Sequence, residues 1–107
     1  MAKVVKSAFA RKDFSEIFQY MAVETSLEHA QKFLMVIEEK CELLAKFPQM
    51  GKAQNSLFLN LRTFPIKNYI IFYFPTESGI EVLRVLHASR DVKNVFETML
   101  GDADPIN

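Results

Sequence analysis

Three features that mark particular classes of protein are missing from this sequence: paired cysteines, a net charge and a long apolar run. Its single cysteine, Cys41, rules out an intramolecular disulfide, and no Cys/His spacing suits a metal ion. Thirteen basic and thirteen acidic residues cancel, so the chain as a whole exerts no strong field on nucleic acid or a membrane surface. We therefore expect a reducing compartment, with no metal and no other cofactor.

The apolar stretches also limit where the protein works. None approaches the roughly 20 residues that a membrane-spanning helix needs. The first residues lack the apolar core of a secretory signal peptide. These absences predict a cytoplasmic protein that does not engage a membrane.

What the sequence does contain indicates one small domain with an aromatic core. The chain has 107 residues, half of them hydrophobic, and ten are phenylalanine. We expect a single domain over residues 1–100 and an acidic, mobile tail over residues 101–107. Apolar surface left over from such a core favours binding to a partner. Residues 49–93 hold six basic and three acidic residues, too small a surplus to predict nucleic-acid binding.

The first half of the chain is patterned as a strand followed by two helices. Residues 3–9 form a short β-permissive segment. Apolar residues then recur at helical spacing over residues 10–23, and again in a stripe of five turns from Ala30 to Leu44. Because only a few residues separate the two stripes, we expect an antiparallel helical hairpin.

Capping residues mark the bounds of the second helix. Thr25 and Ser26 can both cap its start, and Glu28 follows Thr25 at the spacing of a capping box. Pro48 and Gly51 end it.

The second half is patterned as a β-meander with a final helix. Three β-like runs cover residues 57–64, 69–74 and 80–87, with breaks short enough for hairpins. Residues 69–74 are apolar at every position, which predicts a middle strand covered on both faces. Asp91 can cap a last helix that ends at Gly101. The prediction is an α+β fold in β-α-α-β-β-β order: an N-terminal strand and an antiparallel helical hairpin packed on an antiparallel β-sheet, with a short C-terminal helix.

The most informative segment lies at the end of the last strand, where Arg84, His87, Arg90 and Asp91 follow one another closely. In a regular strand Arg84 and His87 point to opposite faces of the sheet. Each residue also has a structural explanation. A local ion pair and a helix cap account for Arg90 and Asp91, and a histidine at a strand end is more often hydrogen-bonded than catalytic. Arg62 fits either a contact across the sheet or a contact with a partner.

These segments together resemble the ParE branch of the RelE/ParE toxin superfamily. The matching pieces occur in the family's order from about residue 3 to residue 96: Ala10 and Asp13 through Ile17 and Tyr20, Ala30 with Phe33, Leu44-Ala45 with Phe47-Pro48 and Gly51, Leu61-Arg62, Tyr69 and Tyr73 in NYIIFY, and RVLHASRD from Arg84 to Asp91. The resemblance implies the toxin of a bacterial type II toxin-antitoxin system, which binds DNA gyrase and is neutralised by a cognate antitoxin. It further implies a set of partner-binding residues: Arg62, Arg84, His87, Arg90 and Asp91.

A second function within the superfamily stays open. RelE-like members are ribosome-dependent mRNA interferases. In such an enzyme Arg62 and Arg84 would bind the phosphate, and His87 would act as the acid or base. The tyrosine that many such nucleases carry near the C-terminus has no counterpart, since the nearest aromatic residue is Phe96. Ile70 stands where many relatives have arginine. These departures favour a gyrase inhibitor over an enzyme, with the ribosome and mRNA as partners only under the alternative. A further alternative is a non-toxic member of the family that only binds a partner.

Overall fold

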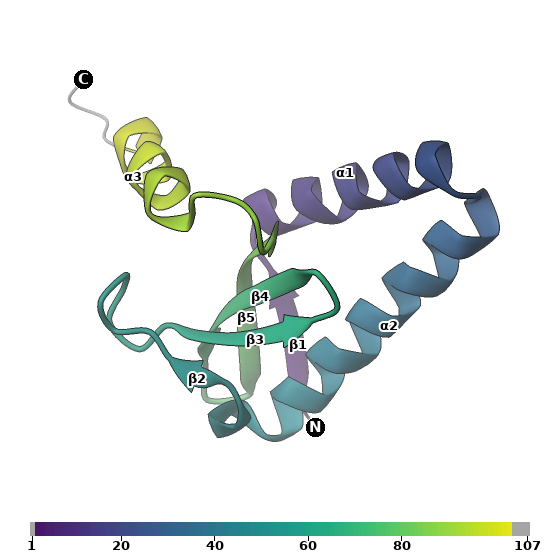
Figure 1. Cartoon of the computed structure of the whole chain (residues 1–107). Coiled ribbons are helices and arrows are strands. Elements are labelled where there is room, and N and C mark those ends of the chain that lie inside the picture. Colours follow the sequence, from purple (N-terminus) through teal and green to yellow (C-terminus); the bar gives the residue numbers. More distant parts are fainter. Residues whose placement is uncertain (1, 104–107) are drawn as a thin grey trace.

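The computed structural model describes residues 2–103 and shows an α+β fold (Figure 1). Its elements follow in the order β1 (Lys3–Lys6), α1 (Ala8–Glu24), α2 (Leu27–Lys46), the 3-10 turn η1 (Pro48–Met50), β2 (Lys52–Ala53), β3 (Arg62–Ile66), β4 (Tyr69–Pro75), β5 (Gly79–His87) and α3 (Val92–Ala103). The predicted fold class, the helical hairpin, the meander and the C-terminal helix are confirmed. No helix in this part of the chain is both long and apolar enough to cross a membrane.

The strands form one sheet in the order β1-β5-β4-β3-β2. Strands β2 to β5 are antiparallel neighbours, as the meander requires. β1 instead pairs with β5 in parallel, with Lys3 opposite Gly79, so the sheet is mixed. β4 lies in the middle and is covered on both faces, as predicted: Ile71 and Tyr73 belong to one core and Phe72 to the other.

Helices cover both faces of the sheet. In Figure 1, α1 and α2 meet at their shared turn and diverge along one face, while α3 stands apart from them. The larger core joins α1 and α2 to the sheet through residues such as Phe14, Ile37 and Tyr73. The smaller core lies under α3, where Phe96 packs edge-to-face on Phe72 with ring centroids 5.1 Å apart. The molecule therefore has three layers, and α3 forms one of them with the chain around Leu57–Leu61.

The first strand is shorter than predicted, because Ser7 starts the first helix. The Ser7 N–H donates to the Val82 carbonyl oxygen at 3.0 Å, which ends the pairing of β1 with β5. The Ser7 hydroxyl donates to the Leu83 carbonyl oxygen at 2.7 Å and accepts from the Ala10 N–H at 3.0 Å. An N-cap serine held in this way fixes both the end of β1 and the first turn of α1.

The predicted capping box of the second helix is wrong, because Thr25 and Ser26 belong to different helices. Thr25 ends α1, with its hydroxyl donating to the Met21 carbonyl oxygen at 2.7 Å. Ser26 alone is the N-cap of α2, and its hydroxyl accepts from the His29 N–H at 3.0 Å. Glu28 lies in the first turn, where its charge still favours the helix dipole.

The third strand was predicted over residues 57–64 but begins only at Arg62. The Leu57 and Phe58 N–H groups both donate to the Gln54 carbonyl oxygen, and the Leu61 N–H donates to Phe58. These turns carry Leu57, Phe58 and Leu61 into the core under α3. The apolar run over residues 57–61 therefore forms turns that cover the smaller core, and it is not a strand. The two-residue strand β2 was not predicted.

A β-bulge in β5 sets the direction of the candidate side chains. Phe72 lies opposite Arg84 but Tyr73 lies opposite Val82, so one residue of β5 is left over between them. After the bulge, Arg84 shares its face with Phe72 and the smaller core, whereas His87 lies opposite Tyr69, which packs on the larger core. The two side chains therefore lie on opposite faces, as expected.

The last helix begins where predicted but does not end at Gly101. It continues to Ala103. The remainder of the predicted tail, residues 104–107, lies outside the described residues.

Candidate docking groove

Arg84 is held by Asp13 of α1. The Nε–Oδ2 and Nη2–Oδ1 distances are both 2.7 Å, which is the two-point geometry of an arginine–carboxylate pair. Only 13% of the Arg84 side chain and 5% of the Asp13 side chain are exposed. The Phe9 ring lies 5.7 Å from the guanidinium carbon and covers it further. Two of the five N–H groups of Arg84 are thus used in the pair with Asp13, and its guanidinium is largely covered.

Asp13 also completes the edge of the sheet. β1 covers β5 only as far as Val82, and the backbone beyond that point would be an open strand edge. Asp13 Oδ2 accepts from the Val85 N–H at 3.0 Å. One buried carboxylate therefore joins α1 to β5 through both a side chain and the backbone. Sequence reasoning missed this role, although an acid within the apolar stripe of a helix, three residues after Ala10, is a usable signal.

His87 lies at the exposed end of β5. Its ring meets Tyr69 edge-to-face at 5.2 Å between centroids. The Ser89 N–H donates to His87 Nδ1 at 3.1 Å, and the Ser89 hydroxyl oxygen lies 2.7 Å from the same atom. Because Nδ1 accepts, the neutral ring carries its proton on Nε2, which has no partner among the described residues. This is a hydrogen-bonded, outward-facing histidine.

Asp91 caps α3, as the sequence predicted. Its Oδ1 accepts from the Asn94 N–H at 3.2 Å. The expected ion pair between Arg90 and Asp91 is absent: the ion pairs of the described residues are Lys6–Glu38 and Arg84–Asp13. Arg90 is exposed and lines hollows beside α1. Its charge is therefore available to a partner.

Three adjoining hollows run along one side of α1, and together we call them the α1 groove. The first lies at the Met21 end, has a volume of about 530 Å³ and includes Tyr20, Tyr69 and His87. The second shares those three side chains and adds Glu16 and Arg90. The third, of about 370 Å³, continues from Glu16 and Arg90 to the gap between α1 and α3. The groove is aromatic at one end, and its other end bears Lys12 and Arg90 beside Glu16.

Tyr20 and Tyr69 give the groove its aromatic end. Tyr20 is 62% exposed, although it lies within residues 10–23, where apolar residues recur at helical spacing. Tyr69 is half-buried, and its ring packs on Phe33 at 5.6 Å between centroids. Burial raises the pKa of Tyr69, and the nearby Tyr20 adds to the shift. The Tyr69 phenol is therefore a neutral hydrogen-bonding group on an apolar platform at physiological pH.

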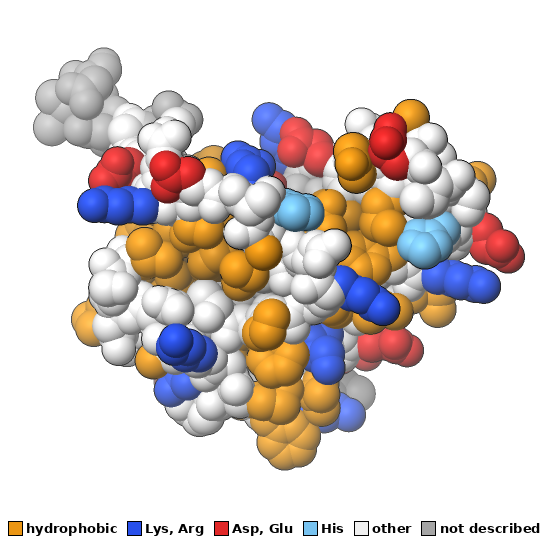
Figure 2. Space-filling model, viewed as in Figure 1, with side chains coloured by type: hydrophobic (Ala, Val, Ile, Leu, Met, Phe, Trp, Pro, Cys, Tyr) orange, Lys and Arg blue, Asp and Glu red, His pale blue; other side chains and the backbone are white. Residues whose placement is uncertain are grey.

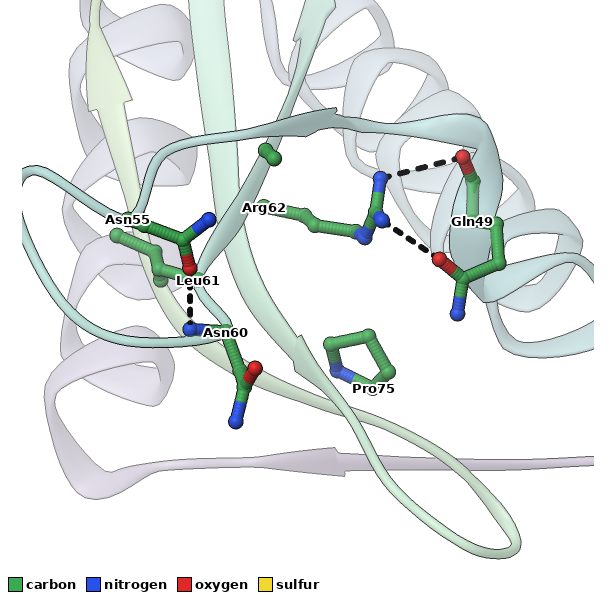
Figure 3. A pocket seen from close by; sticks show the side chains of 7 residues that line it. Gln49, Asn55, Asn60, Leu61, Arg62 and Pro75 are labelled. Carbon is green, nitrogen blue, oxygen red and sulfur yellow. Dashed lines mark hydrogen bonds between the residues drawn. The ribbon is translucent and has the colours of Figure 1, made fainter.

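Arg62 lies elsewhere, at the corner between α2 and β2. Its Nη1 donates to the carbonyl oxygens of Gln49 and Gly51, and its Nη2 donates to Gln49 Oε1 at 2.6 Å (Figure 3). Arg62 faces Tyr73 across the sheet, whereas His87 faces Tyr69 at the other end of β4. The structure therefore separates Arg62 from the other predicted site residues.

The Tyr73 hydroxyl holds the same corner through two hydrogen bonds. It donates to the Pro48 carbonyl oxygen at 2.7 Å and accepts from the Gly51 N–H at 2.9 Å. Burial raises its pKa, with Gly51 and Arg62 opposing the shift. A Cβ on Gly51 would overlap the phenol and approach the Thr63 carbonyl oxygen to 2.9 Å. Only glycine fits here, which explains the Gly51 that the sequence places after the helix.

The residues required for a nuclease do not converge. Arg62 bonds the η1 segment, Arg84 is paired with Asp13, and His87 faces outward from a different side of the sheet. Phe96 is 3% exposed and belongs to the core under α3. Among the described residues no group of three His, Cys, Asp or Glu side chains is placed to hold a metal ion.

Comparison with known proteins agrees with this fold. Residues 4–92 match the model of a family described as the ParE toxin of the type II toxin-antitoxin system parDE. Toxin ParE1 of Caulobacter vibrioides is 25% identical over 84 residues, which cover 78% of this chain and 86% of that protein. Toxin ParE3 of the same organism is 26% identical over 86 residues, 80% of this chain and 86% of that protein.

A solved structure has the same fold. It is described as a chromosomal ParDE toxin-antitoxin system from P. aeruginosa and superimposes with a TM-score of 0.69 at 20% identity, covering 81% of this chain and 96% of the other. Since the family model spans most of the sequence, this chain belongs to the ParE toxin family of type II toxin-antitoxin systems.

Proposed function

We propose that this chain is a toxin that binds DNA gyrase and that a cognate antitoxin neutralises it by filling the α1 groove. The observation that carries the antitoxin part is the groove itself, which combines exposed aromatic side chains with basic ones that have no ion-pair partner among the described residues. A ParE-family toxin needs such a surface, because its neutralisation is a binding event. The cellular location that follows is the cytoplasm, where gyrase acts on the chromosome.

The chemistry of the groove describes the antitoxin segment. Tyr20, Tyr69 and His87 provide a broad aromatic end for an apolar anchor. Lys12 and Arg90 at the other end suit acidic side chains. We therefore expect an amphipathic helix or extended segment with its apolar residues toward Tyr20 and its carboxylates toward α3.

The predicted partner-binding residues take different parts in this proposal. His87 and Arg90 contact the antitoxin directly. Arg84 acts through Asp13, since the pair positions α1 against β5 and so shapes one wall of the groove. Asp91 acts by capping α3, which forms the opposite wall.

The residues that a nuclease would need do not lie together, which supports gyrase rather than mRNA as the target. Phosphate ligands and a proton-transferring group must surround one reacting phosphate. Here Arg62, Arg84 and His87 face three different surroundings. A protein that traps another enzyme's cleaved-DNA intermediate needs no such convergence.

The gyrase proposal is tested with the purified chain in a DNA supercoiling assay. We expect loss of supercoiling and accumulation of cleaved DNA, and restoration of supercoiling when a cognate antitoxin is added. If supercoiling continues and no cleaved DNA appears, gyrase is not the target.

Toeprinting on translating ribosomes separates the nuclease alternative from this proposal. We expect no A-site cleavage by the wild type. Cleavage that disappears in a His87→Ala variant would establish the mRNA interferase instead.

A further inference from the structure

The corner that holds Arg62 contains a second hollow, apart from the α1 groove. It has a volume of about 220 Å³ and lies between the η1 segment and the loop before β3. Figure 3 shows Arg62 reaching toward Gln49, with Asn55 and Asn60 on the opposite side and Pro75 at the edge. We call this the Arg62 hollow.

The hydrogen bonds of Arg62 leave donors unused. A guanidinium has five N–H groups. Three of them go to oxygens of Gln49 and Gly51. The remaining two, on Nε and Nη2, have no partner among the described residues. Asn55 Oδ1 accepts from the Asn60 N–H at 2.8 Å, which fixes the Asn55 amide and leaves its NH₂ group free.

The charge of Arg62 is also uncompensated. Its three partners are neutral carbonyl and amide oxygens, and the hollow is lined by no acidic side chain. No carboxylate of the described residues lies within ion-pair distance of it. A half-buried guanidinium with two unused N–H groups, in a hollow that also bears the Asn55 amide, suits an anion, and a carboxylate matches its planar fork.

The surroundings of the hollow favour a protein over a nucleic acid. Leu59, next to Asn60, is 77% exposed, and Phe47 and Met50 are exposed on either side of Gln49. Figure 2 shows hydrophobic side chains gathered at the lower centre of the view, where α2 ends. Nucleic-acid surfaces cluster lysine and arginine, whereas an arginine among exposed apolar residues is typical of protein interfaces.

We propose that the Arg62 hollow is a second protein-docking site, which takes an Asp or Glu side chain from a partner segment with apolar flanking residues. The proposal extends the proposed function, in which the antitoxin fills the α1 groove and leaves this corner free for another protein. It makes the hollow a contact point of the toxin rather than a purely structural clamp.

Gln49→Glu is the decisive variant. A glutamate at this position keeps the oxygen that accepts from Arg62 at 2.6 Å, so the corner stays folded. It also supplies the missing negative charge from within and repels an incoming carboxylate. Gln31→Glu, on the exposed side of α2, adds the same charge elsewhere and is the matched control.

The test is an NMR titration of ¹⁵N-labelled chain with the peptide N-acetyl-Leu-Glu-Leu-amide and with its Leu-Gln-Leu counterpart. We expect the glutamate peptide to shift the signals of Arg62 Nε–H and the Asn55 and Asn60 side-chain amides. Binding should weaken about tenfold in Gln49→Glu, the loss expected for one charge-assisted hydrogen bond, and stay unchanged in Gln31→Glu.

Three results would overturn the proposal: equal shifts with the glutamine peptide, undiminished binding by Gln49→Glu, or shifts caused by a dinucleotide or inorganic phosphate but not by the peptide. Neither gyrase nor antitoxin takes part in this titration. Its failure therefore leaves the proposed function standing, and a negative gyrase assay leaves the docking site standing.

Discussion

Asp13 and Arg84 lie 71 positions apart in the sequence and meet in a two-point ion pair between α1 and β5. The same carboxylate accepts from the Val85 N–H. Since the pair is nearly buried, removing Asp13 leaves the Arg84 charge uncompensated and the Val85 N–H without its acceptor.

Asp13→Ala should therefore lower the free energy of unfolding by about 3–5 kcal/mol, measured by urea denaturation. Glu16→Ala, one turn further along the exposed side of α1, should change it by less than about 0.5 kcal/mol. Equal effects of the two substitutions would show that the pair does not hold α1 to the sheet.

Gly51 and Gly101 offer a matched pair of substitutions. Gly51→Ala should cost about 3 kcal/mol of stability, because its Cβ overlaps the buried Tyr73 phenol and the Thr63 carbonyl oxygen has no room to move. Gly101→Ala meets nothing within 4 Å inside α3 and should stabilise by about 0.5–1 kcal/mol. Thermal unfolding of both variants checks the two signs.

Tyr20 should carry a large share of antitoxin binding. Tyr20→Ala should weaken the complex by about 2 kcal/mol, roughly thirtyfold, as measured by calorimetry. Met35→Ala is the control, because Met35 is equally exposed at 62% but lies on α2, away from the groove. If both variants bind the antitoxin as wild type does, the α1 groove is not its docking site.

Cys41 should make the fold sensitive to alkaline pH. Burial raises the pKa of its thiol from 9.0 to about 12, and the Glu38 carboxylate adds to the shift. The neutral thiol is favoured in the folded state, so its stabilisation is complete below pH 9 and is lost as the pH rises toward 12, by about 1.4 kcal/mol per pH unit.

Urea unfolding of wild type and Cys41→Ala at several pH values between 8 and 11 tests this dependence. The difference in stability between the two proteins should narrow above pH 9. Parallel pH profiles would mean that the thiol does not titrate differently in the folded and unfolded chains.

The elements that the sequence predicted best are those whose pattern is local. The stripes of α1 and α2 repeat at helical spacing, the β4 run is apolar throughout, and Asp91 precedes an amphipathic segment. Each of these depends on neighbours within a few residues, so the sequence alone suffices.

The elements that escaped prediction depend on distant partners. Leu57 and Phe58 have the composition of a strand, but the core under α3 uses them as a cover. The sequence does not indicate that Arg84 is paired, because its partner Asp13 lies 71 positions away. The family resemblance groups Arg62 with His87, although β4 separates them in space. The structure around these residues depends on partners that are distant in the sequence. The sequence alone therefore names them as candidates without giving their contacts.

The parallel pairing of β1 with β5 has a consequence for synthesis. β1 is translated before the other described elements, whereas its partner β5, from Gly79 onward, follows all of them except α3. The nascent chain must hold its first strand unpaired until nearly every other element has emerged, and loop closure over that span is slow. The sheet of this fold is therefore completed only after β5 has been translated.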